Sequence, residues 1–147
     1  MTSKLSFEEK YNLLTGRIFM HTTRLLNHNF KASGIDITKE QWTVLAVLWQ
    51  HDGVPQHIIA DETGRDKPSI TRLLDNLEKL GYIVRRADAN DRRVNSIFLT
   101  PKGVKSEKKI MAVVDETFTN LTDRLTEKQM QSVREVFKTI YSNIEKR

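Results

Sequence analysis

The sequence predicts a mainly α fold with a small β-wing: a winged helix-turn-helix between N- and C-terminal dimerisation helices. Between Pro55 and Gly103, a helical segment, a glycine turn, a basic second helix and a hairpin follow one another. Apolar residues at helical spacing fill the segments on both sides of this run. We expect residues 1–147 to form a single domain, with 36–100 as the winged part and 6–32 and 101–146 as the dimerisation helices.

Two helices at the centre of the chain are predicted from their turn and their periodicity. Gln56 to Thr63 forms the first, and Gly64 supplies the positive-φ residue that lets a second helix start at an angle. The second runs from Lys67 to Leu80 and has one apolar stripe at a 3.6-residue period. The stripe consists of Ile70, Leu73, Leu74, Leu77 and Leu80.

The opposite side of the second helix carries side chains that suit DNA. It presents Lys67, Pro68, Ser69, Thr71, Arg72 and Asn76. Apart from the proline, these are short donors and acceptors with two cations, the types that contact base edges and phosphates from the major groove. Asp75 and Glu78 are the exceptions, and we expect them to point away from DNA.

A hairpin follows, with strands predicted at Tyr82 to Arg86 and Ser96 to Leu99. Its polar loop has Asn90-Asp91 as the expected turn pair, with Arg92 and Arg93 beside it. Paired arginines at a hairpin tip can enter the minor groove, whose negative potential attracts guanidinium groups. The alternative is an ordinary solvated loop.

The positive charge of the chain is concentrated in this region. Residues 64–105 contain ten Lys or Arg and five Asp or Glu, an excess of five positive charges that equals the net charge of the whole chain, +5. The rest of the chain is therefore near neutral, and the local field of this region favours association with a polyanion.

This part of the chain resembles the MarR family of winged-helix transcriptional regulators. The resemblance lies in IADETGRDKPSITRLLDNLEKLGYIVRR (59–86) and DRRVNSIFLTPKG (91–103). The family's wing signature matches Asp91, Arg93, Leu99, Thr100 and Gly103. The resemblance implies that Arg93 enters the minor groove, that Asp91 braces the wing through an ion pair, and that Lys67 to Asn76 contains the recognition surface.

The flanking segments predict long amphipathic helices. Ser6 and Glu9 form a capping-box pair that opens a helix to about Phe30, Thr100-Pro101 starts another, and Thr126 with Gln129 opens the last. The last helix shows a narrow seam: Met130, Val133, Phe137, Ile140 and Ile144. These stripes can close a core within the chain, but three such helices offer more apolar face than a small winged domain covers. We therefore expect a symmetric homodimer and an inverted-repeat operator.

A further helix is predicted at Ile37 to His51, with Thr38 as N-cap and Gln41 at N3. The family resemblance implies a crevice beside it in which a small aromatic or phenolic effector binds. Trp42, Trp49 and His21 are the candidate pocket residues, and the alternative is that the two tryptophans belong to the core.

Composition excludes several classes of function. The chain has no cysteine, so disulfides and thiolate sensing or metal sites are excluded, and none of its four histidines pairs at chelating spacing. We expect no metal, no cofactor and no catalytic residues. No signal peptide or membrane span is evident, which predicts a cytoplasmic protein.

The function expected from these features is a DNA-binding transcriptional regulator, most simply a homodimeric repressor that an effector releases from double-stranded DNA. The alternatives are a transcriptional activator or an architectural DNA-binding protein without small-molecule control.

Overall fold

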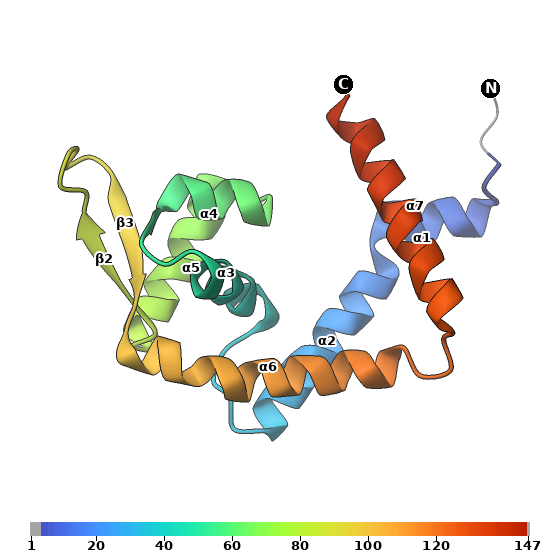
Figure 1. Ribbon diagram of the computed structural model, residues 1–147, viewed down its shortest axis with the longest axis horizontal. Helices are drawn as coiled ribbons and strands as arrows, with labels where there is room; N and C mark the ends of the chain where they lie inside the picture. The colour runs from blue at the N-terminus through green and yellow to red at the C-terminus, as the bar shows by residue number, and fades with distance from the viewer. Residues whose placement is uncertain (1–3, 147) are drawn as a thin grey trace. The chain divides into compact units, whose positions relative to one another are not determined.

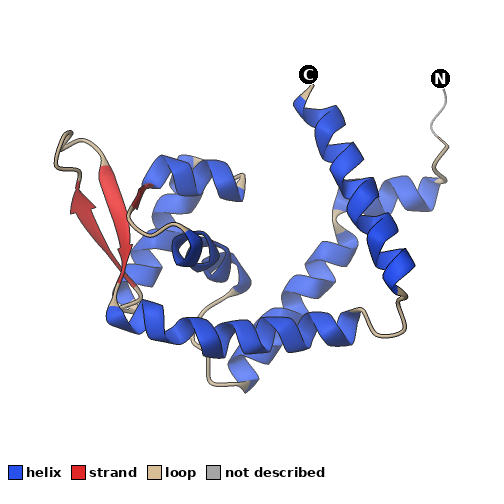
Figure 2. Ribbon diagram, in the orientation of Figure 1, coloured by secondary structure: helices blue, strands red, loops and turns tan. Residues whose placement is uncertain are grey.

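The computed structural model describes residues 4–146, and this part of the chain contains seven helices and three short strands (Figures 1 and 2). The elements in order are α1 (Phe7–Thr15), α2 (Arg17–Ala32), α3 (Lys39–Gln50), β1 (Val54–Pro55), α4 (Gln56–Thr63), α5 (Lys67–Lys79), β2 (Ile83–Ala87), β3 (Asn95–Leu99), α6 (Pro101–Leu121) and α7 (Glu127–Glu145). The mainly helical fold with a small antiparallel wing is confirmed. The chain divides into two compact units between Asp115 and Glu116, and each is described by itself.

The first helical segment differs from the expectation in one respect. A single helix from Ser6 to about Phe30 is wrong, because the helix ends at Gly16 and a new one starts at Arg17. Gly16 has a φ of 63°, a left-handed conformation that glycine adopts without strain and that ends an α-helix. The predicted capping box of Ser6 and Glu9 is present.

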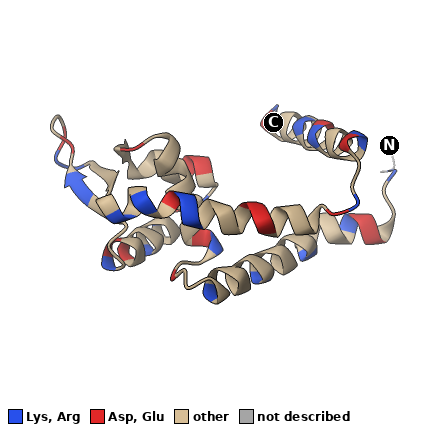
Figure 3. Ribbon diagram, turned by 60° about the horizontal axis from the view of Figure 1, so that its bottom comes forward, with Lys and Arg blue, Asp and Glu red and all other residues tan. Residues whose placement is uncertain are grey.

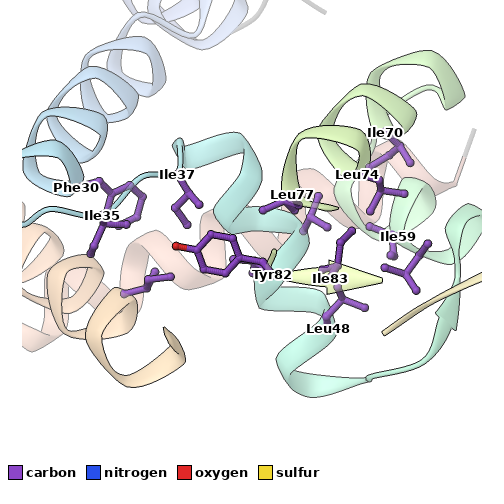
Figure 4. Close-up of a cluster of buried hydrophobic side chains, with 14 of the residues drawn as sticks. Phe30, Ile35, Ile37, Leu48, Ile59, Ile70, Leu74, Leu77, Tyr82 and Ile83 are labelled. Carbon is purple, nitrogen blue, oxygen red and sulfur yellow. The ribbon is translucent and has the colours of Figure 1, made fainter. Parts of the chain in front are cut away.

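The core of the first unit gathers side chains from α2, α3, α4, α5, the sheet and α6 as far as Val114 (Figure 4). The side chains of Val44, Leu45 and Leu48 make α3 its central element. The stripe predicted on α5 is buried at Ile70, Leu74 and Leu77 and partly buried at Leu73 and Leu80. The periodicity of α5 therefore identified the face that packs inward.

The three strands form one antiparallel sheet in the order β1-β3-β2. In the hairpin Ile83 pairs with Leu99 and Ala87 with Asn95. Strand β2 therefore lies one residue later than predicted, and β3 begins one residue earlier but ends at Leu99 as predicted. Strand β1 was not predicted, because two residues are too few to show alternation. It pairs with β3 at Val54 and Ile97 and fixes the start of α4 beside the wing.

The second unit comprises the last turns of α6 and helix α7. The predicted capping box of Thr126 and Gln129 starts α7. None of the described residues of α7 is buried, although its apolar seam is present. Exposed apolar side chains are also frequent on α1 and α2 of the first unit, where Phe7 is 82% and Leu14 84% exposed. Both ends of the chain thus present apolar faces without cover inside their own unit.

Candidate nucleic-acid interface

The cap and the buried stripe of helix α5 determine which of its side chains face outward. The Asp66 carboxylate accepts a hydrogen bond from the Ser69 amide at 2.8 Å, and Pro68 occupies the first turn. This hydrogen bond to the charged form lowers the pKa of Asp66. With Ile70 and Leu74 buried, Lys67, Pro68, Arg72 and Asn76 are exposed on the outer side, as the sequence predicted.

Thr71 differs from the other predicted contacts because its hydroxyl is already occupied. It donates to the Lys67 carbonyl at 2.9 Å and accepts from the Gln56 side-chain amide at 2.8 Å. Gln56, the first residue of α4, therefore links the two helices of the helix-turn-helix. Sequence reasoning missed Gln56, since a polar residue at a helix start has many other roles.

The wing places both of its arginines at the tip. The Val94 amide donates to the Asp91 carbonyl at 3.0 Å, and this closes a turn with Arg92 and Arg93 as its central residues. The sequence predicted Asn90-Asp91 as the turn pair. This prediction is wrong, because Arg92-Arg93 occupy the centre of the turn. Both arginines are exposed to solvent.

Asp91 braces this tip through the backbone. Its carboxylate accepts the Arg93 amide at 3.0 Å, and no ion pair of Asp91 occurs among the described residues. The ion pair that the family resemblance implied is therefore replaced here by an Asx-type turn. Asp88 adds a second brace, because its carboxylate accepts the amides of Asn90 and Asp91.

A groove of about 500 Å³ lies between the helix-turn-helix and the wing. Its lining comes from α4, the start of α5 and the wing: Gln56, His57, Ala60, Asp61, Arg65, Lys67, Arg93, Val94 and Asn95. The groove brings together Lys67 and Arg93, which the sequence assigned to two different contact elements. It also adds Arg65, which sequence reasoning did not select. Three cations thus line one concave surface that contains a single carboxylate, Asp61.

The acidic residues of α5 form ion pairs with an arginine of the wing strand β2. Arg85 of β2 contacts the Asp75 carboxylate at 2.7 Å and the Glu78 carboxylate at 3.6 Å. It also donates to the Thr71 carbonyl at 3.3 Å. Figure 3 shows the cationic strand β2 among the charged residues of the winged part. Sequence reasoning expected Asp75 and Glu78 to avoid DNA but did not find their partner.

The Leu-Thr-x-x-Gly part of the wing signature has a structural explanation. The Thr100 hydroxyl donates to the Gly81 carbonyl at 2.6 Å and accepts the Gly103 amide at 3.1 Å, so it caps α6 and joins it to the end of α5. A Cβ atom at Gly103 would overlap the carbonyl oxygen of Tyr82. Only glycine lets α6 pass so close to the strand.

The candidate effector residues lie in two places. Trp42 donates from Nε1 to the Met111 sulfur at 3.5 Å, and Trp49 donates from Nε1 to the Gly103 carbonyl at 3.0 Å. Both rings are partly buried against the core, so packing against α6 accounts for them. His21 lines a separate depression of about 260 Å³ with Tyr11, Thr15, Arg17, Met20 and Arg24. The effector pocket stays a prediction.

Residues 4–146 contain no group of three or more His, Asp or Glu placed to hold a metal ion. In the same part of the chain, no helix combines the length and the apolar character that crossing a membrane requires.

Comparison with known proteins points to one family. Residues 37–94 match the model of the MarR family. The transcriptional regulator FarR of Neisseria gonorrhoeae is 29% identical over 101 residues, which cover 69% of each chain. The transcriptional regulator TtmR of Methylorubrum extorquens (strain PA1) is 40% identical over 68 residues, which span 46% of this chain but only 35% of that relative. The crystal structure of a MepR–DNA complex from S. aureus superposes with a TM-score of 0.82 at 29% identity, covering 91% of this chain and 97% of that one.

Proposed function

Since this chain belongs to the MarR family of DNA-binding transcriptional regulators, we propose that it acts as a homodimeric repressor that binds a pseudo-palindromic operator. A regulator of this family is not an enzyme. In the proposal, residues 36–100 contact DNA, and residues 6–32 and 101–146 form the dimer. Repression follows from occupation of the operator, which excludes the transcription machinery from the same DNA.

The observation that carries the proposal is the groove between the helix-turn-helix and the wing. A recognition helix in the major groove and a wing in the adjacent minor groove require cations on both elements that face one duplex. Lys67 and Arg93 line the same concave surface, and Arg65, two residues before Lys67, lines it as well. The MepR structure, at 29% identity, is a complex with DNA, which supports the same use of this fold.

In and around this groove we assign separate roles to α5 and to the wing. Lys67, Pro68, Ser69, Thr71, Arg72 and Asn76 form the recognition surface of α5. Arg72 and Asn76 are exposed and offer donors that base edges accept, whereas Thr71 is held by Gln56 and contributes through its methyl group or through position. Arg92 and Arg93 anchor the wing, and Asp91 shapes the turn that presents them.

The dimer is supported by apolar faces that neither unit covers by itself. Helix α7 has 19 residues and none of them is buried, with Phe137 63% and Ile144 65% exposed. On α1 and α2, Phe7, Leu14 and Ile18 are more exposed still. Soluble proteins rarely leave contiguous apolar faces of this kind without a partner. A two-fold dimer would place the recognition helices roughly 34–36 Å apart, one turn of DNA.

Release by an effector is the part of the proposal that rests on family likeness. A small aromatic or phenolic ligand would act only by favouring a dimer whose helix spacing does not fit DNA. Trp42 and Trp49 both contact α6, so their fluorescence would report a ligand that changes the packing of this helix. A ligand that changes the fluorescence but not operator affinity would not be an inducer.

The experiment that tests the proposal is selection of purified full-length protein against random duplex DNA. The selected duplex and a scrambled duplex of equal length are then titrated by fluorescence anisotropy at two salt concentrations. Enrichment of an inverted repeat, bound at least about a thousandfold more tightly than the scramble, is the expected result. Equal, salt-sensitive binding to both duplexes would refute the repressor and favour an architectural role. Transcription in vitro from a promoter that contains the repeat distinguishes repression from activation.

A further inference from the structure

We infer that Arg85 is a positioning residue for DNA recognition, which fixes the angle between the recognition helix and the wing and cancels the acidic charge on α5. This inference rests on the proposed function, because it concerns how the same surface recognises DNA. Arg85 lies outside the groove, and none of the sequence-predicted contacts includes it. Its role follows from the three acceptors that surround its guanidinium group.

The geometry is that of a clamp between two elements. Strand β2 is followed by the wing tip, and α5 packs against this strand. From β2, Arg85 reaches acceptors on three turns of α5: the Thr71 carbonyl, Asp75 and Glu78. Contacts at positions 71, 75 and 78 follow the i, i+4, i+7 spacing of one helix face. A planar guanidinium holds several acceptors at fixed angles, so this clamp restrains rotation of α5 as well as its distance from β2.

The arginine of the clamp is less accessible to solvent than one in an ordinary surface ion pair. The Arg85 side chain is 20% exposed, whereas Asp75 and Glu78 are 50% and 44% exposed. An arginine that is largely buried and already has three acceptors is poorly placed to contact a phosphate. The two carboxylates would otherwise stand unpaired on the helix that approaches DNA, where their charge opposes binding. Arg85 therefore serves recognition through α5 and not by touching DNA.

Arg86 provides a matched control on the same strand. It is exposed, and it lies over the Phe98 ring with its guanidinium carbon 5.0 Å from the ring centroid. Neighbouring residues of a strand point to opposite faces, so Arg85 faces α5 and Arg86 does not. Replacing either residue by alanine removes one positive charge, but only Arg85→Ala opens the clamp.

The decisive variant removes the acceptors and keeps the arginine. Asp75→Ala with Glu78→Ala takes two negative charges from the recognition helix and leaves no side-chain acceptor at either position. Simple electrostatics then predicts tighter binding to all DNA with unchanged preference. The clamp predicts that the scrambled duplex is bound at least as tightly as by the wild type, while the preference for the selected duplex falls by about tenfold. The reason is that α5 can then rotate relative to the wing. The recognition helix and the wing then no longer fit the major groove and the adjacent minor groove of the DNA at the same time.

The experiment measures anisotropy of the full-length variants with the selected and the scrambled duplex, at several salt concentrations. We expect Arg85→Ala to lose preference by about tenfold with an unchanged salt slope, since no phosphate contact is lost. Arg86→Ala should keep its preference within about twofold. Thermal unfolding shows whether each variant is folded. If Arg85→Ala is not folded, Arg85→Lys replaces it, because lysine keeps the charge but cannot hold the same set of acceptors.

Two results would overturn the inference: an unchanged preference in the Asp75→Ala, Glu78→Ala variant, or equal losses of preference in Arg85→Ala and Arg86→Ala. A salt slope that falls by about one in Arg85→Ala would also overturn it, since that marks a direct phosphate contact. Failure of the proposed function is seen separately, in a wild-type protein that does not distinguish the two duplexes.

Discussion

Replacement of Gly103 by alanine tests whether steric overlap, and not backbone conformation, is the reason for glycine at this position. Gly103 lies in the first turn of α6, where alanine would ordinarily stabilise the helix by about 1 kcal/mol. Here the added Cβ atom would overlap the Tyr82 carbonyl oxygen and stand 3.1 Å from Cδ2 of Leu99. The carbonyl cannot yield easily, because it accepts the Thr100 amide at 3.0 Å at the junction of β3 and α6.

The magnitude follows from the groups that must move. Overpacking of this kind costs about 1–3 kcal/mol. A shift of α6 would also weaken the hydrogen bond from Trp49 to the Gly103 carbonyl and the one from the Gly103 amide to Thr100, at about 1 kcal/mol each. After the gain in helix propensity, we expect a net loss of about 2–4 kcal/mol. For a chain of this size that lowers the unfolding midpoint by roughly 5–15 °C.

The assay is thermal and urea unfolding of the full-length variant, followed by circular dichroism and by tryptophan fluorescence. Gly64→Ala is the matched control, because Gly64 has a φ of 64° but no atom within 4 Å of an added Cβ. The control should lose only about 1 kcal/mol through its left-handed backbone. A Gly103→Ala protein as stable as the wild type, or more stable, would refute the steric reasoning.

Three other predictions concern binding, assembly and pH. Arg93→Ala should weaken binding to every duplex and reduce the slope of log K against log salt by about 0.9, whereas Arg72→Ala should relax base preference. Equal slopes for wild type and Arg93→Ala in anisotropy titrations would contradict the wing assignment. Phe137→Glu places a charge on the exposed apolar face of α7 and should shift sedimentation toward the monomer, while Glu135→Gln on the same helix should not; an unchanged dimer would exclude this face. The pKa of Asp66 is lowered, so its capping hydrogen bond stabilises the folded state at pH values above the ordinary pKa of 3.8, and this stabilisation is lost as pH falls through the lowered pKa. The difference in unfolding midpoint between wild type and Asp66→Ala should therefore shrink below about pH 4 and stay constant above about pH 5.

Much of the fold was predictable because local signals and packing agree in this chain. The capping pairs at Thr38 and Thr126 each start a helix where the sequence placed it, and Gly64 ends α4 as expected. The stripe of α5 identified its buried face. The break at Gly16 was missed because glycine inside an apolar period is tolerated or not according to tertiary context, which one sequence does not reveal.

The candidate site was predictable as a set of residue types but not as a set of contacts. Charge and order in the chain selected Arg72 and Arg93, which are both exposed. The contacts of Gln56 with Thr71, and of Arg85 with Asp75, join residues from different elements. Their existence depends on the angle between those elements. No periodicity within one segment encodes that angle, so the residues that set the geometry of the site appear only in three dimensions.

The junction at Thr100 restricts how the length of this chain can vary. Strand β3 ends at Leu99 and α6 begins at Pro101, so a single residue connects the wing to the following helix. One inserted residue there would rotate the face of α6 by roughly 100° relative to the strand. Ile110 and Val114 would then leave the core. The loop from Asp88 to Val94 has no such constraint, because its ends are already joined by a hydrogen bond and its side chains are largely exposed. Insertions and deletions among related chains should accordingly accumulate at the tip of the wing and be absent from its base.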